Sequence, residues 1–353
     1  MALVTHTALK AAARGGFVPE DVMSKLWDIS VIPLPFRDLI GSAENHDNEY
    51  CEWTKDKLQA VDMDNAVVDG ADAGADDNKL GIRVGNHSQI SDKVVSASSR
   101  AKNGGTIAIG DAYAYQVMKR QQELKRDLEA IGLSNQASVA DDGATIPGRV
   151  GGFDAWLTTN TNNGATGSNG GFNTGTGLVV AAVPGTARPL TETMVRNVAQ
   201  SVWEQGGNPS TLMGRPAVIR KLSSYMFGSS AQVATLTSDV REKRGAAVAT
   251  GSVNVFVTDF GVVLEMIANR LQQPTSAGVS TVFVIDPDKA SYSYLSREKT
   301  IELAKTGLSQ KGQMYCDWSL KVFAEEAHGA IRGIDETAAV IAASVDPLDD
   351  EVG

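Results

Sequence analysis

Six aspartates between positions 62 and 77 are the side chains best suited to chemistry. They are Asp62, Asp64, Asp69, Asp72, Asp76 and Asp77. Carboxylate oxygens are the ligands that calcium prefers, but the EF-hand pattern D-x-[DN]-x-[DN]-G with a glutamate at its twelfth position is not met. A run of like charges is usually solvated. The sequence therefore predicts an exposed acidic loop here and no metal site.

A second candidate cluster, Glu325, Glu326 and His328, has the residue types of an acid and base pair. In a strand, Glu326 and His328 share one face and Glu325 lies on the other, which favours a structural role or simple exposure. The remaining histidines, His6, His46 and His87, are scattered along the chain. A catalytic triad would need long-range convergence that the sequence does not indicate.

Motifs for phosphate binding, hydrolysis and zinc binding are missing. There is no GxxxxGK[ST], no GxSxG and no HExxH, and Val180 follows Gly175 and Gly177 where a dinucleotide-binding turn places its third glycine. Cys51 and Cys316 are far apart and lack a ligand spacing, which favours a reducing compartment. We therefore predict no catalytic residue, no cofactor and no enzyme activity.

Charge is distributed unevenly along the 353 residues. The net charge is -10, with 12 acidic and 5 basic residues from 44 to 93, and six acidic and no basic residues from 335 to 353. Nucleic-acid binding needs clustered lysine and arginine, so the balance argues against it. No apolar run approaches the roughly 20 residues of a membrane span, and no signal peptide is indicated.

The elements that would position these residues begin with an arm over 1–45, broken by prolines and rich in apolar residues from Leu26 to Phe36. Such a segment must bury itself against its own core or a neighbour. Residues 46–104 predict a long two-stranded loop, with extended chain over 48–58 and 79–99 and the acidic tip between them. The long loop predicts reach beyond one subunit.

A helix of about 20 residues is predicted within 105–150. Asp111 is suited to its N-cap and Gly132 to the position after its end. An apolar stripe predicts one buried face and leaves Glu129 on the wet face, in an i,i+4 pair with Lys125.

The rest of the chain alternates helical and strand-like patterns. Residues 151–184, rich in glycine, asparagine and threonine, predict a flexible segment. Helical and then β-branched patterns fill 185–285, further strands occupy 286–334, and 335–353 form an acidic tail. The predicted fold class is α+β.

The order of arm, extended loop, long helix and α+β body resembles the Hong Kong 97-type fold of tailed-bacteriophage major capsid proteins. Local phrases similar to that family span most of the chain: EWTKDKL at 52–58, QELKRDLEA at 122–130, GGFDAWLTTNT at 151–161, GGNPSTLM at 206–213, ELAKTG at 302–307 and EEAHG at 325–329. The resemblance implies an N-terminal arm, an E-loop, a spine helix, and peripheral and axial domains. It implies a virion shell subunit assembled in the host bacterial cytoplasm.

The resemblance also implies partners. They are other copies of the chain in hexamers and pentamers, a separate scaffolding protein, a portal and a decoration protein. The resemblance also implies that the shell encloses DNA without sequence-specific binding and that no membrane is involved. Some relatives form Lys to Asn isopeptide bonds, but no motif around Lys55, Lys57 or Lys79 matches, so no covalent crosslink is expected. The candidate inter-subunit contacts are Trp27, Phe36, Trp53, Lys55, Lys57, Arg83, Arg120 and Arg126.

Two other functions fit the same residues. An encapsulin-like compartment shell would share the fold, and would be favoured by a cargo peptide on its inner face. An acidic cytosolic enzyme could use 157–177 as a lid, and would be supported by a deep pocket with two or more titratable groups near that segment.

Overall fold

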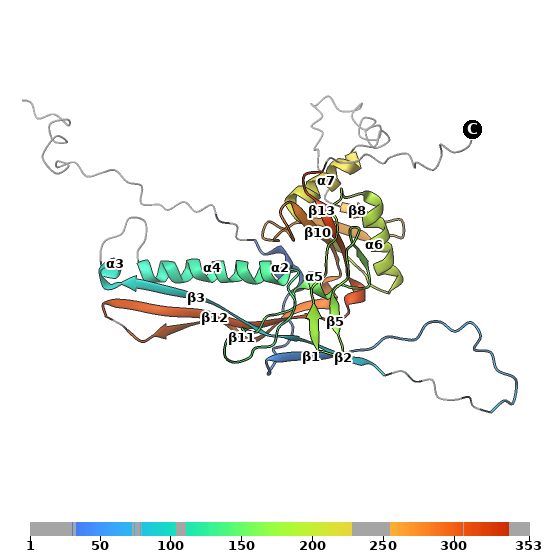
Figure 1. The fold of residues 1–353 in the computed structure, drawn as a ribbon, viewed down its shortest axis with the longest axis horizontal. Coiled ribbons are helices and arrows are strands. Elements are labelled where there is room, and N and C mark those ends of the chain that lie inside the picture. Colours follow the sequence, from blue (N-terminus) through green and yellow to red (C-terminus); the bar gives the residue numbers. More distant parts are fainter. Residues whose placement is uncertain are drawn as a thin grey trace, which may run out of the picture. The chain divides into compact units, whose positions relative to one another are not determined.

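The computed structural model describes residues 30, 33–72, 74, 78, 80–103, 111–227, 255–305 and 307–338. The described chain divides into two compact units, one holding parts of 93–122 and 300–314 and the other holding 33–92, 123–299 and 315–338. Figure 1 shows helices and strands in mixed order along the chain. The predicted α+β class is confirmed.

The larger unit contains a six-stranded sheet. Its strands, in spatial order, are β4 (Thr161–Asn162), β13 (Gly329–Asp335), β10 (Val279–Ile285), β7 (Thr211–Gly214), β9 (Val263–Ala268) and β8 (Val255–Val257). The pairs β13 with β10, β10 with β7 and β8 with β9 are antiparallel, whereas β7 with β9 and β13 with β4 are parallel. Strands from distant parts of the sequence therefore build one sheet.

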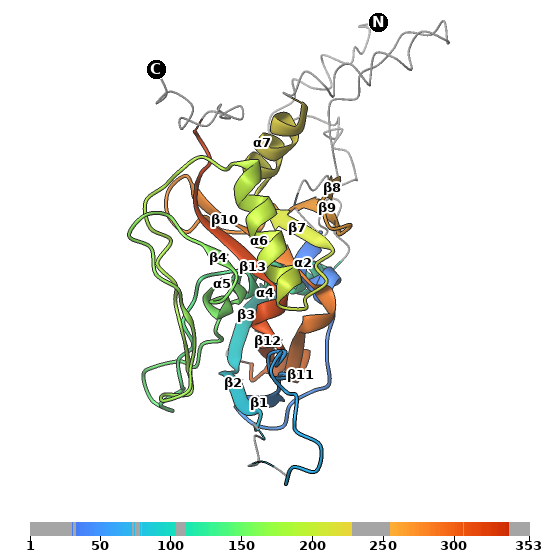
Figure 2. The ribbon, with the colours of Figure 1, turned by 90° about the vertical axis from the view of Figure 1, so that its right-hand side faces the viewer.

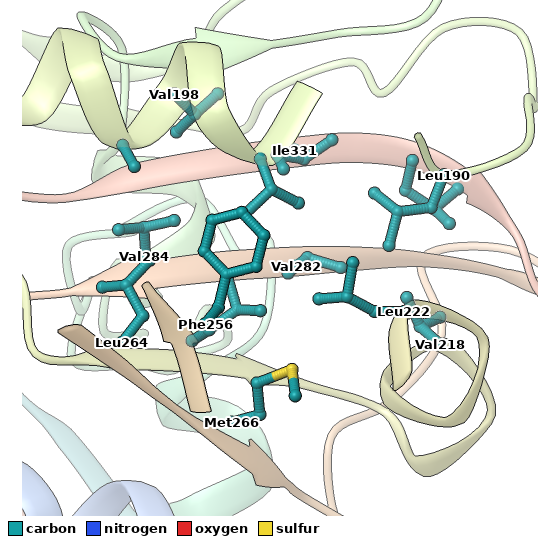
Figure 3. Packing of buried hydrophobic residues seen from close by; sticks show 14 of the residues in the cluster. Leu190, Val198, Val218, Leu222, Phe256, Leu264, Met266, Val282, Val284 and Ile331 are labelled. Atoms are coloured by element: carbon teal, nitrogen blue, oxygen red, sulfur yellow. The ribbon is translucent and has the colours of Figure 1, made fainter. Parts of the chain in front are cut away.

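Helices α6 (Glu192–Glu204) and α7 (Pro216–Phe227) pack on one face of this sheet (Figure 2). Thr191 caps α6 by accepting from the backbone N–H of Met194, and Pro216 occupies the first turn of α7, where its missing N–H is not needed. The alternating inward residues of the strands meet the apolar faces of both helices in a single cluster that includes Val198, Phe256 and Val282 (Figure 3). Burial of this cluster is the main stabilisation of the sheet layer.

Two smaller sheets and a long hairpin complete the strand inventory of the described residues. β1 (Tyr50–Lys55) pairs antiparallel with β2 (Ile82–His87), and β5 (Gly171–Asn173) pairs with β6 (Leu178–Val180). β11 (Ala290–Leu303), β12 (Ser309–Val322) and β3 (Gln89–Ser98) form a three-stranded sheet with β12 in the middle. The predicted extended segments on both sides of the acidic loop are confirmed as strands.

The long helix α4 spans Ala112–Gly132. Asp111 caps it as predicted, because its Oδ1 accepts from the backbone N–H of Tyr113 at 2.8 Å. The prediction that Gly132 lies just after the helix is wrong, because Gly132 is the last helical residue. A Cβ at this position would lie 2.2 Å from the hydroxyl of Tyr292. This glycine is needed for close packing and not for a left-handed turn.

The smaller unit holds α3 (Ser99–Asn103), the first half of α4 and the tips of β11 and β12. The backbone N–H of Ser99 donates to the carbonyl of Leu308 at 3.0 Å. A Cβ at Gly312 would lie 2.2 Å from the Tyr113 hydroxyl, so this tyrosine packs directly on strand β12.

The segment predicted to be flexible has a defined hydrogen-bonded path. Ser168 and Val183 form an antiparallel bridge, and the side chain of Arg188 donates to the carbonyl of Asn162 at 2.9 Å. Glycines allow these close approaches, since a Cβ at Gly164 would lie 2.1 Å from the carbonyl oxygen of Thr186. The high glycine content of 151–184 predicts flexibility from the sequence. In the structure these glycines allow neighbouring backbone segments to pack closely.

Candidate inter-subunit contact surface

The hairpin of β1 and β2 carries a long loop from Asp56 to Gly81. The register pairs Lys55 with Ile82, so the loop leaves and returns at one point. A Cβ at Gly81 would lie 2.7 Å from the carbonyl oxygen of Lys55, which explains a glycine at the return. Figure 1 shows the loop continuing beyond the paired strands. The hairpin thus fixes the base of a long excursion.

Apolar side chains along this loop are almost fully exposed. They are Leu58, Val61, Met63, Val67, Val68 and Leu80, each between 80% and 94% exposed. Scattered exposed apolar residues are ordinary, but a dense series on one loop marks an interaction surface. The sequence prediction of an exposed loop agrees with these exposures. The valines and the methionine between the aspartates are the residues that indicate contact with another molecule.

Trp53 lies on β1 and has its own partners inside the subunit. Its ring lies 5.3 Å from that of Trp156 and 6.4 Å from that of Phe323, measured between centroids. Trp53, predicted as an inter-subunit contact, is therefore packed within its own subunit, because β1 lies against α5 (Phe153–Trp156) and the end of β12. Truncating Trp53 would remove packing within the subunit as well as any contact with a neighbour.

Three of the predicted contact residues, Lys55, Lys57 and Arg83, are cations near the ends of β1 and β2. Lys55 forms an ion pair with Glu326, and the Nζ of Lys57 donates to Oε1 of Gln205 at 2.6 Å. Arg83 pairs with Glu52 at 3.1 Å, and its side chain is 70% exposed. The structure thus places these cations at the base of the loop, with Arg83 the most accessible.

The remaining predicted contacts fall elsewhere. Phe36 is fully buried against Phe153 and Tyr292, so its prediction as an inter-subunit contact is wrong: its side chain has no surface to offer. Arg120 and Arg126 lie on α4 and are partly buried, and the Nε of Arg126 has no hydrogen-bond partner among the described residues. Trp27 lies outside the described residues.

A buried carboxylate anchors helix α2 (Pro35–Ile40), which lies within the predicted arm of residues 1–45. Glu129 accepts from the backbone N–H groups of Phe36 at 2.7 Å and Arg37 at 2.8 Å, and from the side-chain amide of Asn269 at 2.6 Å. Burial raises the pKa of Glu129, while these three donors oppose that rise. The prediction that Glu129 lies on the wet face is wrong.

A second buried ionic group joins β13 to α5. The Nε of Arg332 donates to Oδ1 of Asp154 at 2.6 Å, and its Nη2 donates to the carbonyl oxygens of Asp154 and Leu157. Both side chains are almost fully buried. Such a network holds the segment after α5 against the sheet.

The predicted acid and base cluster has a structural arrangement. Glu325 accepts from the backbone N–H groups of Thr158 and Thr159, and Glu326 pairs with Lys55. The ring of His328 is fully buried, and its Nδ1 accepts from the backbone N–H of Asp286 at 3.2 Å. Burial lowers the pKa of His328 to about 4. The structural interpretation favoured by the sequence agrees with these contacts.

The neutral His328 should make the folded subunit sensitive to acid. The unfolded chain binds a proton near pH 6.5, whereas the folded chain binds it only near pH 4, so stability falls as pH drops through that window. Between pH 8 and pH 5 the loss from this group amounts to about 2 kcal/mol. Urea unfolding at both pH values should show that loss in the wild type and a smaller one in His328→Asn, whose amide oxygen can accept the same hydrogen bond. Equal losses in both proteins would refute the assignment.

Cys51 and Cys316 are both buried free thiols. Burial raises the pKa of each, that of Cys316 to about 12. Neither is arranged as a nucleophile.

Cavities near the glycine-rich segment are small. The cavity lined by Lys55, Trp156, Phe172 and Glu325 holds about 100 Å³, below the roughly 300 Å³ of a typical ligand pocket. Both titratable groups in its wall already have partners within the subunit. This cavity gives no support to the enzyme hypothesis.

Among the described residues, no group of three or more histidine, cysteine, aspartate or glutamate side chains could hold a metal ion. Asp76 and Asp77 of the acidic loop lie outside those residues. No helix in the described part of the chain is long and apolar enough to cross a membrane.

Comparison with known proteins identifies the family. Residues 3–335 match the sequence model of the family described as SU10 major capsid protein. A stretch of 103 residues is 37% identical to the major capsid protein of Escherichia phage Phieco32, and this match spans only 29% of this chain and 29% of that protein.

Solved structures share the fold at low identity. The capsid asymmetric unit of cyanophage A-1(L) is 12% identical with a TM-score of 0.56, and the match covers 90% of this chain and 97% of that one. The encapsulin complex of Synechococcus elongatus is also 12% identical, with a TM-score of 0.51 over 96% of this chain and 98% of that one. The fold is thus the Hong Kong 97-type fold of phage capsid subunits. Because the family model matches nearly the whole length of the chain, the chain belongs to the SU10 major capsid proteins.

Proposed function

We propose that this chain is the major capsid protein that builds the icosahedral shell around the double-stranded DNA of a tailed bacteriophage. The observation that carries the proposal is the β1–β2 loop, whose apolar side chains are exposed and need cover from another molecule. Family membership supplies the kind of partner, which is another copy of the same chain. The likeness to an encapsulin is one of fold alone and does not favour a cellular compartment.

Within this proposal each segment has a part in assembly. Residues 1–45 form the arm, 46–104 the E-loop over an adjacent subunit, and 105–150 the spine helix and first part of the peripheral domain. The axial domain is centred on 185–285 around five-fold and six-fold axes, and 286–334 return to both domains. The six-stranded sheet supports adding β4 and β13 to the axial domain, since both pair within it.

The partners follow from the same proposal. Copies form hexamers and pentamers in the host bacterial cytoplasm, assisted by a separate scaffolding protein and joined by a portal and a decoration protein. The net charge of -10 keeps the shell protein from adhering to the DNA that it encloses. Its role is structural and needs no catalytic group.

The contact residues proposed for the E-loop begin with its exposed apolar side chains, and Lys57, Arg83 and Trp53 at its base complete the surface. Lys57 and Arg83 offer charged groups at the rim, where they govern encounter more than affinity. Trp53 contributes by holding the hairpin in place.

Polar replacement of the loop should block assembly without unfolding the subunit. Changing Leu58, Val67 and Leu80 to serine removes apolar area that is exposed in the free chain, so stability should change by less than about 0.5 kcal/mol per site. Each side chain covered by a neighbour contributes about 1.5 to 3 kcal/mol to association, so shells should be lost. Co-expression with the scaffolding protein, followed by negative-stain electron microscopy, measures shell yield.

A matched control changes polar residues of the same loop, Asn65→Ser and Asp72→Asn, and should form normal shells. Chemical unfolding of both variants checks that the subunit stays folded. Normal shells from the triple serine variant would remove the loop from the interface, and a purified wild-type chain that stays monomeric with scaffold present would overturn the proposed function.

A further inference from the structure

A cavity of about 300 Å³ opens at the base of the β1–β2 hairpin. Its wall combines the end of β1, the turn after α6, the 3-10 turn Pro287–Lys289 and the connection from β12 to the turn Glu325–Ala327. The lining includes three lysines, Lys55, Lys57 and Lys289. Two of these four segments, the end of β1 with the residues after it and the turn Pro287–Lys289, thus bring three ammonium groups to one concave surface.

The acidic groups in the wall do not neutralise these lysines. Lys55 pairs with Glu326, whereas Lys57 has only the neutral amide oxygen of Gln205 as a side-chain partner. Asp56 accepts from the backbone N–H of Lys57 at 2.8 Å. Among the described residues, the ammonium of Lys289 has no hydrogen-bond or ion-pair partner. Two ammonium groups are therefore available to an anionic ligand.

We propose that this cavity binds the acidic segment 339–353 of the same chain, through its carboxylates and the ammonium groups of Lys57 and Lys289. The segment contains Asp346, Asp349, Asp350 and Glu351 and no lysine or arginine. The acidic loop over 56–81 is a poorer ligand, because it brings Lys57 and Lys79 with it. Charge complementarity therefore favours 339–353.

The distances within the chain allow this contact. β13 starts two residues after Ala327, which lines the cavity, and its seven residues carry the chain roughly 20 Å away. Beyond it, the ammonium of Lys221 donates to the carbonyl oxygens of Asp335 and Ala338. The following residues can extend by up to about 50 Å, which is more than twice the return distance.

Carbodiimide coupling tests the contact on the full chain. The reagent activates a carboxylate, which forms an amide with a nearby lysine while the carbodiimide leaves as its urea. Mass spectrometry should find 339–353 joined to Lys57 or Lys289 in preference to Lys299 and Lys305, which are exposed and outside the cavity. An equal mixture of ¹⁵N-labelled and unlabelled chains should give links within one chain.

Amide hydrogen exchange gives a second measure without coupling. Lys57→Gln with Lys289→Gln should speed exchange of 339–353 by about fivefold, as expected for the loss of two surface ion pairs. Lys299→Gln with Lys305→Gln, which removes the same charge elsewhere, should leave the rate unchanged. Equal rates in both double variants, coupling spread evenly over all exposed lysines, or links mainly between different chains would overturn the proposal.

Discussion

Replacing Arg332 with methionine is expected to lower the free energy of unfolding of the subunit by about 3 to 5 kcal/mol. The guanidinium is fully buried and donates to the carboxylate of Asp154 and to the carbonyl oxygen of Leu157 at 2.8 Å. Methionine preserves much of the volume but leaves a buried carboxylate without its cation. Since whole domains are stable by about 5 to 15 kcal/mol, such a loss would leave little folded protein at elevated temperature.

Urea unfolding followed by tryptophan fluorescence measures this effect. Arg83→Met is the matched control, because the pair of Arg83 and Glu52 is exposed and should contribute less than about 1 kcal/mol. Adding Asp154→Leu to Arg332→Met removes the orphaned charge and should recover part of the loss. If Arg332→Met and Arg83→Met cost the same, the buried pair does not stabilise the fold as argued.

Glu129→Ala should cost about 3 to 5 kcal/mol. The change leaves the backbone N–H groups of Phe36 and Arg37 and the amide of Asn269 without their acceptor, and each unsatisfied buried donor costs about 1 to 3 kcal/mol. Gln121→Ala, on an exposed position of the same helix, controls for helix propensity and should be nearly neutral. A similar stability for both variants, measured by urea unfolding, would contradict the anchoring role.

The pH dependence of Glu129 adds a signature with a defined sign. Burial raises its pKa in the folded state, so the folded chain holds the proton longer than the unfolded chain. The contribution of this group to stability is therefore fully present below the ordinary value of 4.5 and is lost as pH rises through the folded pKa. Glu129→Gln, which cannot titrate, should lack this decline.

Local signals along the chain predict the elements well. The N-cap at Asp111 and the β-branched runs within 185–285 each act through a few neighbouring residues. Helix α4 begins after Asp111, and strand β10 lies within that β-branched region. The resemblance in element order also predicts the fold, because it reflects the whole chain and not one motif.

Long-range contacts are where the sequence prediction fails. Glu129 is paired with Lys125 by helical spacing, yet its partners come from positions 36, 37 and 269, and nothing local indicates them. Arg332 and Asp154 are 178 residues apart and give no joint signal in one sequence. One hint was available for Glu129, since it directly follows Leu128 at the edge of the apolar stripe. The prediction of Phe36 and Trp53 as inter-subunit contacts missed their packing within the subunit for the same reason. Their aromatic partners come from distant segments of the chain.

The position of β13 in its sheet has a consequence for synthesis on the ribosome. This strand is the last described element, yet it pairs with β10 on one side and β4 on the other, and it carries Arg332. A growing chain therefore cannot close this sheet until residues near 335 have left the ribosomal tunnel, many seconds after β4 at about 5 to 20 residues per second. A nascent chain that ends before β13 lacks the strand that joins β4 to β10, so its six-stranded sheet stays incomplete until that strand has been made.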